Sequence, residues 1–208
     1  MRRICTFVLI ALVAVGLASA NEKLMDASAL DATAPDRYNV TLETTKGDIV
    51  IAVDRSLAPI GADRFYNLVK NGFFDGCRFF RVVPNFVVQF GLNGSPAVNA
   101  VWREARIQDE PVKATNARGT LTFAKASQPN TRTTQMFINL VDNANLDRQG
   151  FSPFGQIISG MEFVDGIFAG YGGSPRQDLI ISKGNAYLES EFPRLDFIKK
   201  AVITPHEE

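Results

Sequence analysis

The stretch Phe79–Gly91 reads Phe-Phe-Arg-Val-Val-Pro-Asn-Phe-Val-Val-Gln-Phe-Gly. Its Phe and Val residues predict a buried strand region, which Pro84-Asn85 interrupts. Two polar side chains, Arg81 and Gln89, break the apolar run. A guanidinium is costly to bury without a partner. Arg81 is therefore expected either to form a structural ion pair or to face a bound molecule.

The same stretch resembles the signature of the cyclophilin-type peptidyl-prolyl cis-trans isomerases, and the likeness covers Phe80–Gly91. A second match follows at Gln135-Met136-Phe137-Ile138-Asn139, with further matches at Leu146-Asp147 and Phe154-Gly155. The resemblance extends from about residue 38 to residue 203. Two motifs in the right order and spacing make it specific, and it implies that the Arg, Phe and Gln of the first motif line a proline site.

A hairpin and a helix are predicted upstream of this stretch. Tyr38–Thr44 and Asp48–Asp54 alternate apolar and polar residues around a Lys-Gly turn, which is typical of paired strands. Pro59 suits a first helical turn, with Asp54 or Ser56 as its expected cap. Apolar residues at helical spacing continue to Gly72, where the helix is expected to end.

Downstream, short strands alternate with turns, and one further helix is predicted at Met161–Ala169. The remaining strands are predicted within Phe73–Gly91 and at Gly119–Ala124, Met136–Leu140, Phe154–Ile158 and Phe197–Ile203. Residues 92–110 and 170–184 are expected to be loops, with Trp102 as a packing residue, and 185–192 a helical insertion. This pattern predicts a mainly β fold, a closed antiparallel barrel capped at its ends. Family resemblance implies eight strands and one helix over each opening.

The first 20 residues read as a signal peptide. A positive start is followed by the apolar run Phe7–Leu17, which is too short to span a bilayer, and by Ala18-Ser19-Ala20, a typical cleavage pattern. A membrane anchor is the alternative. We expect cleavage near Asn21 and an exported protein, periplasmic or secreted, with a flexible lead-in at residues 21–37, an isomerase domain at 38–203 and a charged tail at 204–208.

Composition excludes several classes of protein. The chain has 22 basic and 22 acidic residues, so no nucleic-acid surface and no polybasic membrane patch is predicted. The single histidine, His206, and the absence of a paired Cys motif or a Gly-rich phosphate loop argue against His-based triads, metal sites and nucleotide sites. We expect no cofactor, no metal, no stable membrane association after signal cleavage, and a monomer.

Proline isomerisation needs none of those groups. The X–Pro bond is held by amide resonance, and the rotation barrier of a peptide bond is roughly 18–20 kcal/mol. A catalyst must fit the twisted bond better than either planar form. An apolar pocket can anchor the proline ring, amide hydrogen bonds can hold the flanking chain, and a cationic donor can stabilise the nitrogen lone pair that twisting releases. The expected substrates are proline-containing polypeptides.

The sequence offers side chains for each task. Arg81 is the predicted donor, and Phe86 and Gln89 complete the predicted catalytic set. The predicted ring pocket consists of Phe86, Val87, Phe137 and Leu146. Gln89 and Gln135 are expected to hold substrate carbonyls or to position Arg81. Family resemblance adds the backbone of Ala124-Lys125-Ala126 as a strand-like partner for the substrate. Composition alone would instead make Phe86 and Phe137 plain core residues.

Four positions depart from the family pattern, and one is Phe90, which precedes Gly91 where the common form has Gly-Gly. Val87 replaces the usual Met, which predicts a shallower pocket, and Asn145 stands where many members carry Trp. The pocket His is missing, and Gly150 or Phe151 occupies its region. Resemblance implies that cyclosporin-type peptides bind partly through the missing indole. These changes bear on substrate preference and inhibitor binding more than on activity.

Two other functions remain open from the residues. One is a non-catalytic module that binds proline peptides, which would not need Arg81 as a donor. The other is a barrel that binds a small apolar ligand, which the many large Phe and Val residues disfavour because small barrels fill with side chains.

Overall fold

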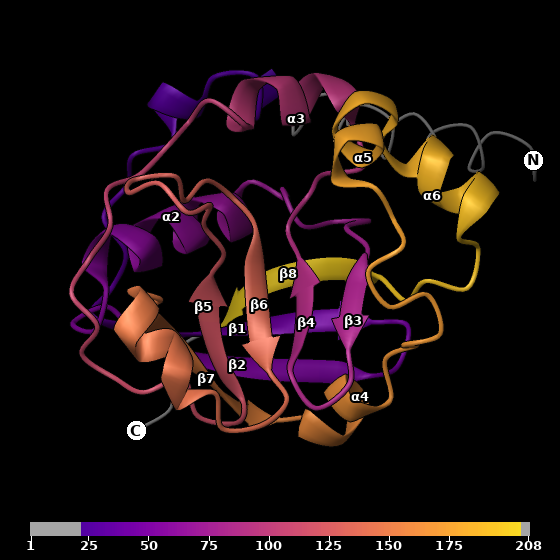
Figure 1. The fold of residues 1–208 in the computed structure, drawn as a ribbon. Helices are drawn as coiled ribbons and strands as arrows, with labels where there is room; N and C mark the ends of the chain where they lie inside the picture. The colour runs from indigo at the N-terminus through magenta and orange to yellow at the C-terminus, as the bar shows by residue number, and fades with distance from the viewer. Residues whose placement is uncertain (1–21, 205–208) are drawn as a thin grey trace, which may run out of the picture.

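The computed structural model describes residues 22–204 and is built around one eight-stranded antiparallel sheet (Figure 1). The strands are β1 Arg37–Thr44, β2 Asp48–Asp54, β3 Arg81–Val83, β4 Val87–Phe90, β5 Thr120–Phe123, β6 Met136–Asn139, β7 Pro153–Ser159 and β8 Ile198–Thr204. The predicted hairpin is confirmed, with Tyr38 opposite Val53 and Leu42 opposite Ile49. The other predicted strands also form, with ends shifted by a few residues.

The sheet curls into a half-barrel and is open along one side. Its strand order is β3-β4-β6-β5-β7-β2-β1-β8, so β3 and β8 are the edges and do not pair with each other. The residues just before the two edge strands meet at a single bridge, Arg78 to Phe197, flanked by backbone bonds such as Phe79 N to Asp196 O at 3.0 Å. The predicted closed barrel is therefore not shown, because β3 and β8 themselves form no ladder and the backbone bonds near this bridge come from residues that precede β3.

Aromatic side chains fill the interior of the curled sheet. Phe65, Phe90 and Phe154 are at most 1% exposed, and they pack edge-on or tilted against neighbouring rings. The thiol of Cys77 is also buried and donates to Phe73 O at 3.4 Å, and burial raises its pKa well above the ordinary value. Within the described residues this filling argues against a lumen for a small apolar ligand.

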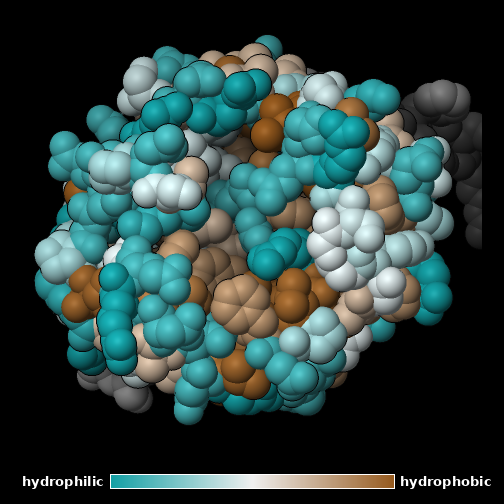
Figure 2. Space-filling view, in the orientation of Figure 1, coloured by the Kyte–Doolittle hydropathy of each residue, from teal (hydrophilic) through white to brown (hydrophobic). Residues whose placement is uncertain are grey.

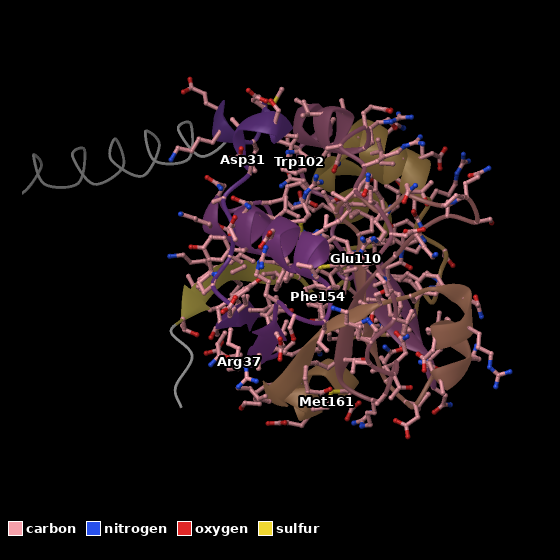
Figure 3. All side chains as sticks on the ribbon, turned by 90° about the vertical axis from the view of Figure 1, so that its left-hand side faces the viewer. Asp31, Arg37, Trp102, Glu110, Phe154 and Met161 are labelled. Carbon is pink, nitrogen blue, oxygen red and sulfur yellow. The ribbon has the colours of Figure 1, made fainter. Side chains whose placement is uncertain are left out.

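The helix α2, Pro59–Lys70, covers one end of the half-barrel (Figure 1). The predicted caps are wrong: Asp54 instead accepts from Ser56 in the preceding turn, and Ala58 at the N-cap position has no side-chain oxygen. The carboxylate of Glu110, from a segment distant in the sequence, caps the helix instead (Figure 3). It accepts hydrogen bonds from the amides of Ile60 and Gly61 at 2.7 and 3.0 Å. A carboxylate there satisfies free N–H groups and complements the helix dipole.

Two stretches that were predicted to be loops each contain a short helix. Residues 92–110 contain α3, Pro96–Trp102, and residues 170–184 contain α5, Gln177–Lys183, so neither stretch is wholly irregular. The predicted insertion is confirmed as α6, Asn185–Glu191, while the second capping helix shortens to α4, Met161–Asp165. Two short 3-10 helices, η1 Ala27–Ala29 and η2 Ala144–Gln149, complete the fold. Ile180 on α5 and Leu188 on α6 pack with Phe80 in a small apolar cluster that is separate from the main core. The two helices are too short for their apolar periodicity to predict this packing.

The N-terminal segment lies on the domain rather than extending from it. Leu24 is only 2% exposed, and its carbonyl accepts from the Trp102 indole at 2.8 Å (Figure 3). The amide of Ala34 donates to Asp63 on α2 at 2.9 Å. The predicted flexible lead-in is thus docked from residue 22 onward. No helix among residues 22–204 is long and apolar enough to cross a membrane, and the predicted signal peptide and charged tail lie largely outside the described residues.

Candidate active site

An apolar hollow opens on the face formed by β3, β4 and β6, and hydrophilic side chains surround it (Figure 2). It contains a cavity of about 240 Å³. The residues that line the cavity are Arg81, Phe86, Val87, Gln89, Ala124, Lys125, Phe137, Leu146, Gln149 and Phe151. Eight of these were predicted as site residues from the sequence, and tertiary folding brings them together from three strands, the β3–β4 turn, the segment after β5 and the 3-10 helix at Ala144–Gln149.

Strand pairing sets the positions of Arg81 and Gln89. The two residues are directly opposite each other on β3 and β4, and Gln89 is also opposite Phe137 on β6. The guanidinium of Arg81 donates to Gln89 Oε1 at 3.1 Å, and Gln89 Nε2 donates to Gln135 Oε1 at 2.9 Å. This chain orients all three side chains along one wall, because each amide oxygen is already engaged.

Arg81 has no carboxylate within ion-pair distance among residues 22–204. Its guanidinium lies 5.9 Å from the centroid of the Phe86 ring and is partly exposed. Gly173 approaches the other side, and a Cβ there would lie 3.8 Å from Arg81 Nε. Of the two roles predicted for Arg81, the structural ion pair is not found among the described residues. Its charged group instead lines the cavity, where it can face a bound molecule.

The floor of the cavity is a small apolar cluster separate from the main core. Val87, Phe137 and Leu146 are each 2–6% exposed, and Phe86, Ala124 and Phe151 pack against them. Such a floor can bury the ring of a proline without any polar group losing its partners. Because the cluster sits at the surface of the sheet, its aromatics are accessible in a way that the core aromatics are not.

The Phe151 ring and the Lys125 side chain form a part of the cavity lining that the sequence did not assign, since only the backbone of Lys125 was expected to contact the substrate. The Phe151 ring packs at 72° against Phe137 with centroids 5.7 Å apart, and Lys125 Nζ lies 5.6 Å from the Phe151 centroid. The ammonium also lies against the backbone of Gly150, where an added Cβ would be 3.0 Å away. Only the spacing to the missing family histidine marked this region, and Gln149 carried no signal at all.

The segment that carries Leu146 is held by Asp147. This carboxylate accepts from Thr115 Oγ1 at 2.6 Å and from the Asn116 amide and side chain at 2.8 Å. Burial alone would raise the pKa of Asp147, but these hydrogen bonds together outweigh it and hold the pKa below the ordinary value. Asp147 therefore anchors η2 beside the cavity as a charged group.

Three predicted residues lie outside the cavity. Ala126 and Gln135 instead line an adjoining groove of about 440 Å³ between α3, α5 and the loop before β6. The Gln89–Gln135 hydrogen bond connects this groove to the cavity. Asn145 is exposed at the surface of η2 and does not line either hollow.

The arrangement supplies one oriented cation, a second cation in the cavity lining and an apolar floor. No group of three or more His, Cys, Asp or Glu side chains that could hold a metal ion occurs among residues 22–204. The lining has no nucleophile–base pair of the kind that acyl transfer uses. Its chemistry is limited to binding, desolvation and electrostatic stabilisation.

Known proteins resemble this chain in sequence. A family model described as cyclophilin type peptidyl-prolyl cis-trans isomerase/CLD matches residues 39–185. The Acinetobacter baylyi peptidyl-prolyl cis-trans isomerase is 39% identical over 136 residues, which cover 62% of this chain and 70% of the relative. Peptidyl-prolyl cis-trans isomerase B of Escherichia coli is 32% identical over 157 residues, covering 68% of this chain and 95% of the relative.

Solved structures show the same fold. The crystal structure of a Cryptosporidium parvum cyclophilin type peptidyl-prolyl cis-trans isomerase superposes with a TM-score of 0.61 at 22% identity, covering 82% of this chain and 99% of that one. The structure of the same protein in the presence of the dipeptide Ala-Pro gives a TM-score of 0.58 at 23% identity, with 81% and 99% coverage.

Proposed function

This chain belongs to the cyclophilin-type peptidyl-prolyl cis-trans isomerases and is an isomerase of X–Pro peptide bonds, and we propose that Arg81 is its electrostatic catalyst. The observation that carries the proposal is the position of Arg81 on the cavity wall. Its guanidinium is oriented by Gln89 at 3.1 Å, and no carboxylate in the described chain neutralises it.

The mechanism uses the difference between planar and twisted X–Pro bonds. In the planar ground states the prolyl nitrogen lone pair is conjugated with the carbonyl and accepts hydrogen bonds poorly. Twisting releases the lone pair, so a guanidinium aimed at it stabilises the transition state more than either ground state. Each ~1.4 kcal/mol of this preference raises the rate about tenfold.

The apolar cluster supplies the anchor that makes this twist productive. A proline ring on Val87, Phe137 and Leu146 stays fixed while the residue before it rotates. Gln89 positions Arg81, because its own amide is held in turn by Gln135 at 2.9 Å. The Phe86 ring, with its centroid 5.9 Å from the guanidinium, adds a cation–π contact to Arg81.

The proposed substrates are proline-containing segments of unfolded or extended polypeptides. The Cryptosporidium protein was crystallised in the presence of Ala-Pro, which supports recognition of a proline unit in this fold. The groove beyond Gln135 continues the cavity along the sheet and offers room for residues flanking the proline. A folding catalyst needs such a surface because its substrates are chains rather than isolated dipeptides.

Export is proposed as well, and it rests on residues 1–20 of the sequence alone. The basic start, apolar stretch and Ala-Ser-Ala pattern support cleavage by a signal peptidase near Asn21. The isomerase would then act on polypeptides outside the cytoplasm. We propose that it does so as a monomer.

Arg81→Ala tests the mechanism in a protease-coupled assay on a short X–Pro peptide. The variant should lose about a hundredfold or more in kcat/KM, because removal of one transition-state donor has effects of that size. Arg81→Lys should also be poor, since an ammonium lacks the planar fork that engages Gln89 and the substrate together.

Arg37→Ala is the matched control. Arg37 pairs with Asp54 at 3.7 Å on β1, away from the cavity, and its side chain is 65% exposed. This variant should keep natural turnover, and thermal unfolding should show that all three variants are folded. Turnover by Arg81→Ala within a few-fold of the natural protein would contradict the mechanism.

A further inference from the structure

We propose that Lys125 selects substrates with an acidic residue next to the X–Pro bond, an inference that rests on the proposed function. Family resemblance involves only the backbone at this position, as a strand-like partner for the substrate. The structure adds the side chain of Lys125, which lines the cavity together with Arg81 and whose ammonium lies over the Phe151 ring. The charge would act on residues that flank the proline, and Arg81 would act on the X–Pro bond itself.

The position of the Lys125 ammonium is determined by three contacts. It lies 5.6 Å from the centroid of Phe151, against the backbone of Gly150, and 3.5 Å from Asp109 Oδ2. The side chain is only 14% exposed, so these contacts restrict it to the rim of the cavity. A charge held in one place selects between ligands better than one on a freely moving surface lysine.

The carboxylates near Lys125 do not neutralise the site. Asp109 is shared, because its Oδ1 also lies 3.6 Å from Arg132 Nε and its Oδ2 accepts from the Asn130 amide. Glu110 is likewise engaged by Arg132 at 2.9 Å.

The charge balance of this region is therefore positive. The residues that line the cavity include two cations, Arg81 and Lys125. No Asp or Glu is among the residues that line the cavity. A substrate carboxylate that enters the cavity is thus attracted by both Arg81 and Lys125.

The length of an extended chain decides which substrate residues Lys125 can select, namely those next to the proline. An extended chain advances about 3.3 Å per residue, and a proline on Phe137 places the adjacent side chains at the cavity rim. A Glu there can reach the ammonium, whereas a Lys would be repelled by two cations. The preference should be electrostatic and should weaken with salt.

Matched peptides measure the preference directly. Ala-Pro peptides with Glu immediately before the Ala or immediately after the Pro would be compared with Gln versions by NMR exchange spectroscopy, which needs no coupling protease. In low salt the natural protein should favour Glu over Gln by about three- to fivefold in kcat/KM for at least one position, a size typical of partly exposed ion pairs. About 0.5 M salt should remove most of that ratio.

Variants show whether Lys125 causes the preference. The quantity compared is the ratio of kcat/KM for the Glu and Gln peptides, not the rate on either peptide alone. Lys125→Met should at least halve the ratio, and Lys125→Glu should bring it below one. Lys113→Met is the control, because Lys113 donates to Ser56 O away from the cavity, and it should keep the natural ratio. An unchanged ratio in Lys125→Met, or equal turnover of Glu and Gln peptides by the natural protein, would overturn the inference. Absence of turnover on every peptide would instead overturn the proposed function.

Discussion

The role of Arg81 depends on which groups surround its guanidinium in the folded chain. In an apolar strand it could have been half of a buried ion pair. In the folded chain it is directly opposite Gln89 and has no carboxylate within reach in the described residues. The cost of leaving a guanidinium unpaired is reduced by its partial exposure and by the Phe86 ring. The remaining free-energy cost is expected at an active site, because an unpaired charge is what can act on a substrate.

Asn145 leads to a prediction about inhibitors. It is exposed on η2 next to the buried Leu146, and it offers an amide where many family members offer an indole. Loss of one aromatic contact and one donor should weaken cyclosporin-type peptides by about 1–3 kcal/mol, or roughly ten- to a hundredfold. We expect an active isomerase that is comparatively insensitive to these inhibitors.

Asn145→Trp should recover part of the sensitivity with little change in the turnover of short peptides, which contact Arg81, Phe86 and Phe137. Inhibition titrations of both proteins check this. Nanomolar inhibition of the natural sequence would show that the absence of the indole is not decisive.

Glu110 shows how one element is stabilised by another that is far away in the sequence. Its carboxylate caps α2 and pairs with Arg132, and both side chains are at most 5% exposed. Glu110→Gln should lower the free energy of unfolding by about 3 kcal/mol, because it leaves the buried Arg132 charge short of a partner and one helix amide without an acceptor. Urea denaturation measures the change.

The control for Glu110 is Glu104→Gln. Glu104 pairs with Arg103 at the surface at 3.1 Å, and its side chain is 67% exposed. Its replacement should change stability by no more than about 0.5 kcal/mol. Equal urea midpoints for Glu110→Gln and the natural protein would mean that the cap and the pair contribute nothing net.

The anchor of η2 should be sensitive to pH. The folded-state pKa of Asp147 lies below its ordinary value, so the folded protein holds this group ionised more strongly than the unfolded chain does. The resulting stability is fully present above the unfolded pKa of about 3.9 and is lost as pH falls through the folded pKa. Asp147→Asn should therefore cost about 1 kcal/mol near pH 7 and progressively less below pH of about 4. Denaturation curves of both proteins from neutral to acid pH would show this convergence, and a constant difference would argue against it.

At the level of the whole molecule, the curled sheet is filled by aromatic residues and leaves its binding surface outside. The apolar cluster of Val87, Phe137 and Leu146 is separate from the main core. Helices α5 and α6 add a second small cluster beside β3 without covering the cavity. An active site on the outer face can accept a long chain from either side, which suits polypeptide substrates.

The start of the mature chain can be tested on the whole protein. Cleavage near Asn21 would leave only a few residues before Leu24, which docks under Trp102. N-terminal sequencing of the natively expressed protein should therefore find a chain that begins near Asn21, in material recovered outside the cytoplasm. An intact Met1 in cytosolic protein would contradict export.

Local sequence determined most of the sheet and the composition of the site. Alternation of apolar and polar residues predicted β1 and β2 because strand side chains alternate faces, and motif spacing marked Arg81, Gln89 and Phe137. Residues within a few positions of one another control these features, so they can be read without the fold.

Tertiary structure alone decided what depends on distant partners. The cap of α2 by Glu110, the wall formed by Lys125 and Phe151, and the docking of Leu24 each join segments that no periodicity links. The open edge between β3 and β8 is of the same kind, because the meeting of two strand edges depends on the curl of the entire sheet. Long-range contacts of this sort form only when the chain has folded, and they set the charge and shape of the cavity.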